Sequence, residues 1–360
     1  MGKYSLENYE LYKAHKARPK PRKDVIHNLG KGKFTGVELS WKELEINRGE
    51  YRLERLEEAL KQSKNPLIIL NPDPPEWVVD KEAVLFGKLI RRVGSFIDHN
   101  SPVTGVLVTT IHETHLEWDA YPASFQVPII VPLDNPELIR YYQRKGISFG
   151  LFIEGNDNNW IDLCETMGRL HLSNTWEKEP IIIHIGGEEK STEFLEQAKR
   201  WHASFTNACD EYGYQIELRR LLYPKEVSSD GYLPLRFWFV NVGTGLCYLP
   251  YRLTIKLWND QSSYRFPLNV TANQWGIGDI TYHEILKLPK LEEGVYRVAV
   301  GLFMNSMQMN LAIDSSCNQG FYEIGNIKID NQERDELADI WSNYYPEGYY
   351  PLEDPKEPNT

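Results

Sequence analysis

The feature that most constrains the fold is a change in the rhythm of apolar residues near residue 225. Before this point, short and almost continuous apolar runs alternate with longer segments whose apolar residues recur every three or four positions. These are the patterns of buried strands and amphipathic helices. Strands that are apolar on every side are typical of a parallel sheet covered on both faces. The first part of the chain is therefore predicted to be an α/β domain.

The number of strand–helix units narrows the architecture of this domain. Strands are predicted over 34–39, 66–70, 103–110, 127–131, 147–153 and 181–185. Helices are predicted over 53–60, 83–96, 136–144, 160–170 and 191–211. Between six and eight β/α units can be counted, which favours a (β/α)8 TIM-type barrel, closed or slightly degenerate. An open doubly wound sheet is disfavoured, because no GxGxxG follows a strand.

After residue 225 the pattern is that of an all-β domain. Short segments rich in Val, Ile and Tyr follow one another at roughly ten-residue spacing with turn residues between them, which predicts an antiparallel β-sandwich. Residues 251–257 show clear alternation of apolar and polar side chains. We therefore expect four parts, which are a basic arm over 1–33, a barrel over 34–225, a β-sandwich over 226–330 and an acidic aromatic tail over 331–360.

Charge restricts the partners of the chain. The net charge of −11 argues against nucleic acid as the main partner. The basic arm carries nine Lys and Arg against three Asp and Glu, and the tail carries two against eight. A basic arm can bind phosphates or a membrane surface. The alternative, which we favour, is that the arm is solvated or lies against acidic parts of the chain.

The chain shows no signature of a cofactor, a metal or a membrane. Its four cysteines are far apart, which indicates ordinary thiols rather than a zinc ribbon: Cys164, Cys209, Cys247 and Cys317. His112-Glu113-Thr114-His115 lacks one residue of the HExxH zinc motif. We expect no metal, no cofactor and no membrane partner. As written, the protein is expected in the cytoplasm, or outside the cell if a signal peptide has been removed.

Three segments carry a family resemblance. They are Trp41 to Tyr51 (W-x-x-L-E-x-x-x-G-x-Y), Pro74 to Trp77 and Phe237 to Leu257. Together they resemble a family of bacterial proteins with a DUF4832-type C-terminal domain, in which a glycosidase-like barrel precedes a carbohydrate-binding-like sandwich. The resemblance implies a carbohydrate partner, and it implies that the barrel descends from retaining glycoside hydrolases.

Candidate catalytic residues are sought at strand ends, where barrel enzymes place their active sites. The resemblance implies that Glu113, after strand 103–110, is the general acid/base. If the segment stays extended, alternation places His115 and Glu117 on the same side. Glu154 ends strand 147–153 and is the second catalytic candidate. The alternative for Glu154 is a turn or helix-capping role.

The second carboxylate of a glycosidase remains open in the sequence. The resemblance places the nucleophilic glutamate on the penultimate strand, where this chain has His184. A retaining mechanism needs two carboxylates about 5 Å apart, and an inverting mechanism needs them about 6.5–9.5 Å apart. Glu154 or Glu38 could supply the second group. Glu188 is expected in the first turn of the next helix, where negative charge is favourable.

Aromatic and histidine side chains near strand ends are candidate sugar contacts: Trp41, Trp77, His115, Trp118 and His184. The alternative for each tryptophan, as for Trp160, is core packing. Three functions follow. The first is a glycoside hydrolase-like protein with Glu113 as acid/base, and the second is a non-catalytic member that binds glycan or protein. The third is a structural or interaction module. The sequence leaves the oligomeric state open.

Overall fold

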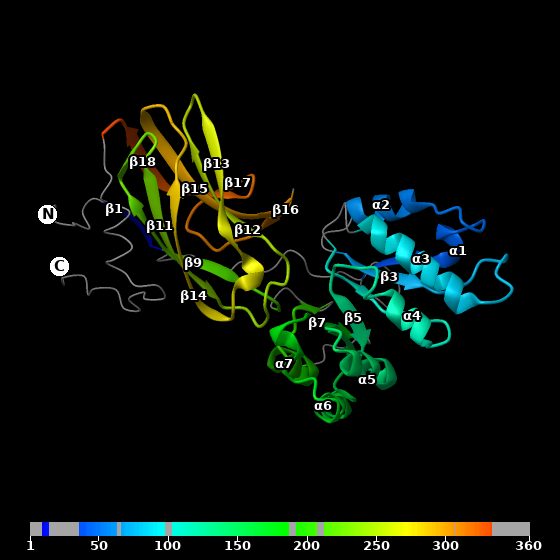
Figure 1. The fold of residues 1–360 in the computed structure, drawn as a ribbon. Helices are drawn as coiled ribbons and strands as arrows, with labels where there is room; N and C mark the ends of the chain where they lie inside the picture. Colours follow the sequence, from blue (N-terminus) through cyan, green and yellow to red (C-terminus); the bar gives the residue numbers. More distant parts are fainter. Residues whose placement is uncertain are drawn as a thin grey trace. The chain divides into compact units, whose positions relative to one another are not determined.

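The chain forms two compact units in a computed structural model (Figure 1). The model describes residues 9–13, 36–62, 66–97, 103–186, 192–206, 212–305 and 307–332. Within these ranges, the α/β unit runs from 36 to 213 and includes 244–248, and the β unit holds the remainder. No helix in the described ranges is long and apolar enough to cross a membrane.

A parallel sheet forms the centre of the α/β unit. Its strands follow the order of the chain, and each is parallel to the one before: β2 (Val37–Ser40), β3 (Leu67–Asn71), β4 (Gly105–Leu107), β5 (Ile129–Pro132), β6 (Gly150–Gly155), β7 (Ile181–Ile185) and β8 (Phe205–Thr206). The connecting helices are α1 (Trp41–Leu44), α2 (Leu53–Gln62), α3 (Glu82–Ile97), α4 (His115–Ala120), α5 (Pro136–Lys145), α6 (Trp160–Arg169) and α7 (Thr192–Arg200). A 3-10 turn, Thr175–Glu177, precedes β7.

Both faces of the sheet are buried, as the continuous apolar strands predict. On one face, strand residues such as Leu39 and Ile183 pack with the helices in one large core. On the other face, a second cluster comprises Leu67, Ile69, Leu107, Ile130, Phe152, Ile182 and Phe205. We call this second side the inner face. Since side chains alternate along a strand, each strand contributes to both cores.

Glycines give the inner face its close packing. A Cβ atom built on Gly105 would lie 2.8 Å from the Pro128 carbonyl oxygen and 2.9 Å from Ile130 Cγ1. A Cβ atom on Gly150 would lie 2.8 Å from Ile130 Cδ1. Both distances are shorter than side chains tolerate, so only glycine leaves room for the Ile130 side chain between β4 and β6.

The sheet is an open, curled half-barrel rather than a closed barrel. The α/β architecture and the parallel sheet are confirmed. Among the described residues, however, the sheet has seven strands, and β8 pairs with β7 but not with β2. The reason lies in the residues that follow β8. Ile216–Pro224, expected within the barrel, form β9 of an antiparallel sheet, so they do not supply an eighth parallel strand.

Helix boundaries in the α/β unit follow from local chemistry. Asn135 precedes α5, and its side-chain oxygen accepts a hydrogen bond from the Leu138 backbone N–H at 3.0 Å. Pro136 occupies the first turn, where a missing N–H costs nothing. Gly146 ends the helix at φ 67°, a left-handed conformation that glycine adopts without strain.

Two sheets make up the β unit, as the sequence predicts for this part of the chain. One has the order β1 (Tyr9–Lys13), β9 (Ile216–Pro224), β11 (Tyr232–Asn241) and β14 (Gly278–Lys287). The other has the order β10 (Glu226–Ser228), β18 (Phe321–Asp330), β15 (Gly294–Met304), β12 (Arg252–Trp258) and β13 (Ser263–Thr271), with β16 (Met307–Met309) and β17 (Cys317–Asn318) alongside. All pairs are antiparallel except β10 with β18.

The sheets of the β unit contact each other through side chains. Tyr223 on β9 is buried, and its hydroxyl lies against Gly325 on β18 in the other sheet. Phe237 and Phe239 on β11 are fully buried and stack with ring centroids 5.6 Å apart. A short 3-10 turn, Ala272–Gln274, connects β13 to the segment before β14.

The predicted basic arm contributes a strand to the β unit. Tyr9–Lys13 pairs with β9 in antiparallel register, so this part of 1–33 belongs to a sheet. The Tyr12 hydroxyl accepts a hydrogen bond from the Asp314 backbone N–H at 2.7 Å. The rest of the arm, Cys209, Glu188 and tail residues 333–360 lie outside the described residues.

We expect Gly105→Ala to destabilise the protein by about 1–3 kcal/mol, because the added methyl group overpacks the inner face. Gly168→Ala is the matched control. It lies in α6 with no atom within 4 Å of an added Cβ, so we expect it to stabilise the protein by about 0.5–1 kcal/mol. Urea unfolding followed by circular dichroism measures both. Equal effects of the two substitutions would contradict the packing role of Gly105.

Candidate functional site

The carboxyl edge of the parallel sheet is where the inner face becomes polar. Alternation along the strands places Ser40, Asn71, Thr109, Glu154 and His184 on the inner side, beyond the apolar cluster. The Ser40 hydroxyl is buried and has no hydrogen-bond partner among the described residues. This edge is the candidate functional site, because parallel α/β sheets bind ligands at the carboxyl ends of their strands.

Glu154 and His184 form the central pair of the site. They lie opposite each other on the neighbouring strands β6 and β7. Glu154 Oε1 is 3.8 Å from His184 Nδ1. The glutamate side chain is 52% exposed, whereas the histidine is 3% exposed. The pair therefore presents a carboxylate to solvent with an imidazole directly behind it.

Burial controls the protonation of His184. Desolvation lowers the pKa of the imidazole, and the nearby Glu154 carboxylate raises the pKa by a smaller amount. The net direction is downward, so the ring is neutral near pH 7. The Phe152 ring adds to the apolar surroundings, with its centroid 6.0 Å from that of His184. A neutral imidazole offers one hydrogen-bond donor and one acceptor.

Glu113 lies in the loop between β4 and α4. It is exposed and has a positive φ of 51°. Asn135, in the loop after β5, donates a hydrogen bond from Nδ2 to Glu113 Oε1 at 3.3 Å. Both loops follow carboxyl ends of strands, so Glu113 lies at the same end of the sheet as Glu154.

The segment after Glu113 is not extended, because α4 begins at His115. Glu117 lies within this helix and is completely buried, whereas Glu113 is exposed. Its carboxylate accepts hydrogen bonds from the backbone N–H of Ile111 at 2.6 Å and of Thr114 at 3.1 Å. The Thr114 hydroxyl donates a further bond at 3.0 Å, and the His112 N–H lies at 3.3 Å. Glu117 thus holds the loop together and caps the helix.

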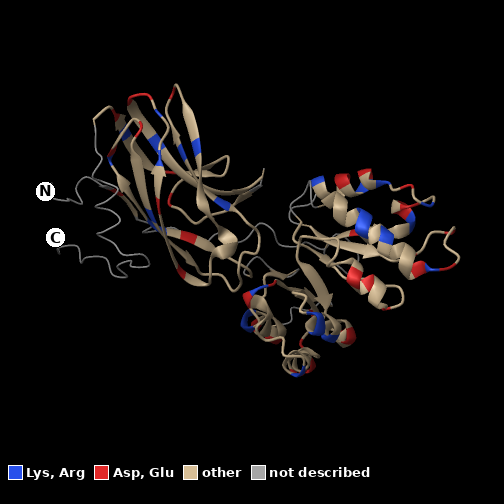
Figure 2. Ribbon diagram, viewed as in Figure 1, with Lys and Arg blue, Asp and Glu red and all other residues tan. Residues whose placement is uncertain are grey.

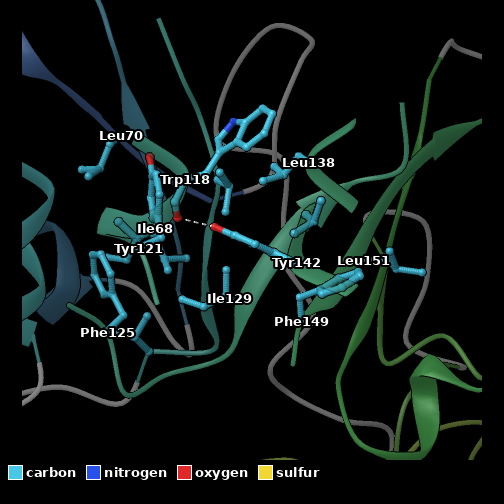
Figure 3. Packing of buried hydrophobic residues seen from close by; sticks show 14 of the residues in the cluster. Ile68, Leu70, Trp118, Tyr121, Phe125, Ile129, Leu138, Tyr142, Phe149 and Leu151 are labelled. Atoms are coloured by element: carbon cyan, nitrogen blue, oxygen red, sulfur yellow. Dashed lines mark hydrogen bonds between the residues drawn. The ribbon is translucent and has the colours of Figure 1, made fainter. Parts of the chain in front are cut away.

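The two aromatic candidates near Glu113 have different surroundings. His115 is exposed, and its ring stacks on Tyr141 with centroids 4.4 Å apart. Trp118 is 4% exposed and belongs to the helix-side core. Figure 3 shows this core, where the Tyr142 hydroxyl donates to the Trp118 carbonyl oxygen at 2.6 Å. Trp118 therefore stabilises the core and presents no open ring to a sugar.

The opening motif of the sequence is a structural cluster centred on Glu45. Trp41 is fully buried, and its indole N–H donates to Glu45 Oε2 at 2.9 Å. The Gly49 N–H donates to Glu45 Oε1 at 2.8 Å, where glycine permits φ 85°. Tyr51 is also hydrogen bonded to this carboxylate. Burial is the largest cause of the raised pKa of Tyr51, and the Glu45 carboxylate raises it further. Trp77 donates to the Glu45 carbonyl oxygen at 3.1 Å.

This cluster decides the roles of the first two tryptophans. The Trp41 ring is covered on all sides, so it cannot stack on a ligand. The Trp77 ring meets Trp41 edge-on with centroids 6.2 Å apart and stays partly exposed. Trp160 is partly exposed as well, and its indole N–H donates to Glu193 Oε2 at 3.2 Å. Trp77 is therefore the remaining predicted sugar-stacking tryptophan with accessible surface.

Sequence reasoning missed Ser40, Asn71 and Thr109. Each follows or ends a predicted strand, which is the signal that could have identified them. Thr109 and Asn71 also have local structural partners, since Thr109 Oγ1 lies 3.0 Å from the Tyr121 hydroxyl and Asn71 Oδ1 accepts from the Asp73 N–H at 3.1 Å. Glu38 is exposed on β2, on the inner side opposite Ile69.

Charged side chains do not form a metal site in the part of the chain that the structure describes. No group of three or more His, Cys, Asp or Glu residues there has the proximity that a metal ion requires.

In the α/β unit, most acidic and basic residues lie on helices, whereas the strands are largely uncharged (Figure 2). On the described strands of this sheet, the exposed carboxylates are Glu38 on β2 and Glu154 on β6.

Comparisons with known proteins give only weak similarity. No family model and no curated protein matches the sequence. The CARDB domain of the PF1109 protein from Pyrococcus furiosus is similar with 9% identity and a TM-score of 0.20, covering 35% of this chain and 100% of that chain. β-Glucosidase from Listeria innocua in complex with glucose shows 13% identity and a TM-score of 0.20, covering 62% and 39%.

A third solved structure covers more of the chain. β-Glucosidase 3B from Thermotoga neapolitana in complex with glucose shows 13% identity and a TM-score of 0.19, covering 90% of this chain and 54% of that chain. The chain thus spans about two fifths of the length of the Listeria innocua β-glucosidase. TM-scores at this level do not establish a shared function.

We expect Glu117→Ala to destabilise the protein by about 3 kcal/mol or more, because several buried N–H groups lose a charged acceptor. Glu113→Ala is the matched control in the same loop. Its side chain is exposed with a single long hydrogen bond, so we expect a change within about 0.5 kcal/mol. Chemical unfolding of both variants tests this difference. A Glu117 variant as stable as the Glu113 variant would contradict the structural role of Glu117.

We expect His184 to make stability depend on pH. Because the folded pKa is lowered, the unfolded state binds the proton more readily, and stability falls as pH decreases below about 6.5. In His184→Gln, the free energy of unfolding should fall less than in the wild type as the pH is lowered from 7.5 to below about 6.5. His171→Asn, at an exposed position, is the control and should keep the wild-type pH dependence. Urea unfolding at several pH values distinguishes these outcomes.

Proposed function

We propose that the chain is a carbohydrate-binding protein with a glycosidase-like α/β unit, and that a sugar contacts the carboxyl edge of the parallel sheet. The Glu154–His184 pair is the observation that carries this proposal. The exposed Glu154 carboxylate provides acceptors for the hydroxyl groups of a pyranose ring. The buried His184 imidazole lies behind this carboxylate, so its role in the proposal is to position Glu154 rather than to contact the sugar.

The other support comes from the family resemblance and from the order of the strands. The resemblance of Trp41 to Tyr51 suggests a glycosidase-like barrel, and strands that pair in chain order are compatible with that type of unit. Trp77 supplies a partly exposed ring of the kind that stacks on sugars. Binding at the carboxyl edge does not require the sheet to be closed.

Binding is preferred to hydrolysis because of the residue on β7. The resemblance assigns a nucleophilic carboxylate to the penultimate strand, and β7, which carries His184, is the last but one strand of the described sheet. A general acid also needs an apolar pocket to raise its pKa. Glu113 is exposed, and the nearby Trp118 ring is buried in the core on the helix side of the sheet.

Hydrolysis is the second candidate function. The observation that favours it is the hydrogen bond from Asn135, which orients Glu113 at the same end of the sheet as Glu154. In this alternative, Glu113 acts as the general acid/base and Glu154 supplies the second carboxylate. The same edge of the sheet would then bind and cleave the sugar.

We expect Glu154→Gln to weaken glycan binding by about tenfold or more, since a hydrogen bond to a charged group contributes about 1.5–3 kcal/mol. A glycan array identifies the ligand, and isothermal titration calorimetry measures its affinity. Glu165→Gln, which removes an exposed carboxylate from the outer helix α6, is the control and should bind as the wild type does. Equal affinities of all three proteins would exclude the Glu154–His184 pair from the site.

Hydrolysis is tested separately with aryl glycosides and polysaccharides. Turnover by the wild type that is lost in Glu113→Gln would support the second candidate function. Turnover that is unchanged in Glu113→Gln would remove this residue from the mechanism. Glycan binding without turnover is the result that the preferred proposal predicts.

A further inference from the structure

One face of the larger sheet in the β unit carries a cluster of basic and aromatic side chains. Lys256 on β12 lies directly opposite Arg265 on β13. Trp258, two residues along β12, lies opposite Arg297 on β15. Since opposite residues in an antiparallel pair share a face, these side chains form one surface, which we call the basic face. Basic residues occur on several strands of this unit (Figure 2).

Two of the cations converge on a single aromatic ring. Lys256 Nζ lies 5.4 Å from the centroid of the Phe321 ring, and Arg265 Cζ lies 5.1 Å from it. Lys256 Nζ is also 5.0 Å from the Trp258 ring. Phe321 is 3% exposed, and the two basic side chains lie over its ring. Trp258 stays partly exposed beside them.

Small residues on β15 allow this convergence. Ala299 lies opposite Lys256, and Gly301 lies opposite Thr254 on the same face. A Cβ atom on Gly301 would lie 2.6 Å from the Phe303 ring, which packs against Phe321 with centroids 4.5 Å apart. The Lys256 side chain can therefore reach across β15, and the Arg265 side chain across β12 and β15, to the ring on β18.

The basic face also carries the exposed carboxylate of Glu323 on β18, which lies opposite Ala299 on β15. In the described part of the chain, Lys256, Arg265 and Arg297 form no ion pair, although the protein has a net charge of −11. Like charges directly opposite each other in a sheet are destabilising. An anion that binds between Lys256 and Arg265 would remove this repulsion. The two cations are therefore expected to be more stable in this arrangement when an anion is bound than when it is absent.

We infer that the basic face binds an acidic polysaccharide whose sugar residues carry carboxylates, such as a polyuronate. Arg265 and Arg297 can each form paired hydrogen bonds with a carboxylate, and Lys256 adds a point charge between them. The partly exposed Trp258 ring provides a flat apolar surface for a sugar ring. This site lies in the β unit, and its existence does not depend on the site proposed at the parallel sheet.

A polyuronate fits this surface better than a nucleic acid does. Nucleic-acid binding relies on many phosphate contacts and on a positive field over the protein. This chain is acidic overall, and the basic face offers few cations around one accessible ring. A short segment of polyuronate provides a few carboxylates for these cations and a sugar ring for the Trp258 ring.

The test compares two polymers with the same sugar backbone, one with free carboxylates and one in which methyl esters remove the charge. Polygalacturonate and its fully methyl-esterified form are each titrated against the full-length protein by biolayer interferometry at low salt. We expect binding to polygalacturonate, loss of binding to the ester, and weakening as salt is raised. The double variant Lys256→Gln/Arg265→Gln should bind polygalacturonate at least about tenfold more weakly. Arg297→Gln, at an exposed position, should weaken binding without affecting the packing over Phe321.

Lys290→Gln, in the exposed loop between β14 and β15, is the matched control and should bind as the wild type does. Circular dichroism verifies that every variant is folded. Absence of binding to polygalacturonate would overturn the inference. So would equal affinities for the polymer and its ester, equal affinities of the wild type and Arg297→Gln, or tighter binding to single-stranded DNA than to polygalacturonate.

Discussion

Burial of the parallel sheet on both faces is the constraint on which the rest of the α/β unit depends. The helices cover one face, and the inner cluster around Ile130 and Phe152 fills the other. Apolar side chains therefore occupy almost every strand position, because each buried one contributes favourable transfer free energy. Apart from Glu38, opposite Ile69, the polar side chains on the inner side of the described strands lie at the carboxyl edge, where the inner cluster ends. Glu154 and His184 meet there for this reason, one exposed and the other enclosed.

Two buried carboxylates stabilise the loops around that edge. Glu45 joins Trp41 to the turn at Gly49, and Glu117 accepts the backbone N–H groups that precede α4. In both places a charged acceptor satisfies donors that would otherwise be buried without partners. The residues that give the opening motif its resemblance to glycosidases therefore have a structural role in this chain. The motif describes how the unit begins, and the residues at the strand ends determine its chemistry.

The sequence predicted the class of the fold well and the details of the site less well. Periodicity identified most of the strands and the change to antiparallel sheets, because the burial of each side chain follows from its local pattern. It was wrong for β8 (Phe205–Thr206), which lies within the helix predicted over 191–211. It did not predict that 216–224 would leave the parallel sheet, since an apolar strand fits either partner. Trp118 illustrates the same limit for the site. Its position after a strand suggested a ligand contact, whereas α4 directs its ring into the core.

The sequence by itself determined which residues are available for chemistry: carboxylates and histidines after apolar strands, and basic residues among aromatic ones in the β unit. Only the tertiary structure decided which of them meet. The pairing of Glu154 with His184, and of Lys256 with Arg265, depends on the register between strands. Register is a long-range property, because it is set by packing between segments far apart in the chain. Local pattern therefore specifies the elements, and packing between them specifies the surfaces that can bind a ligand.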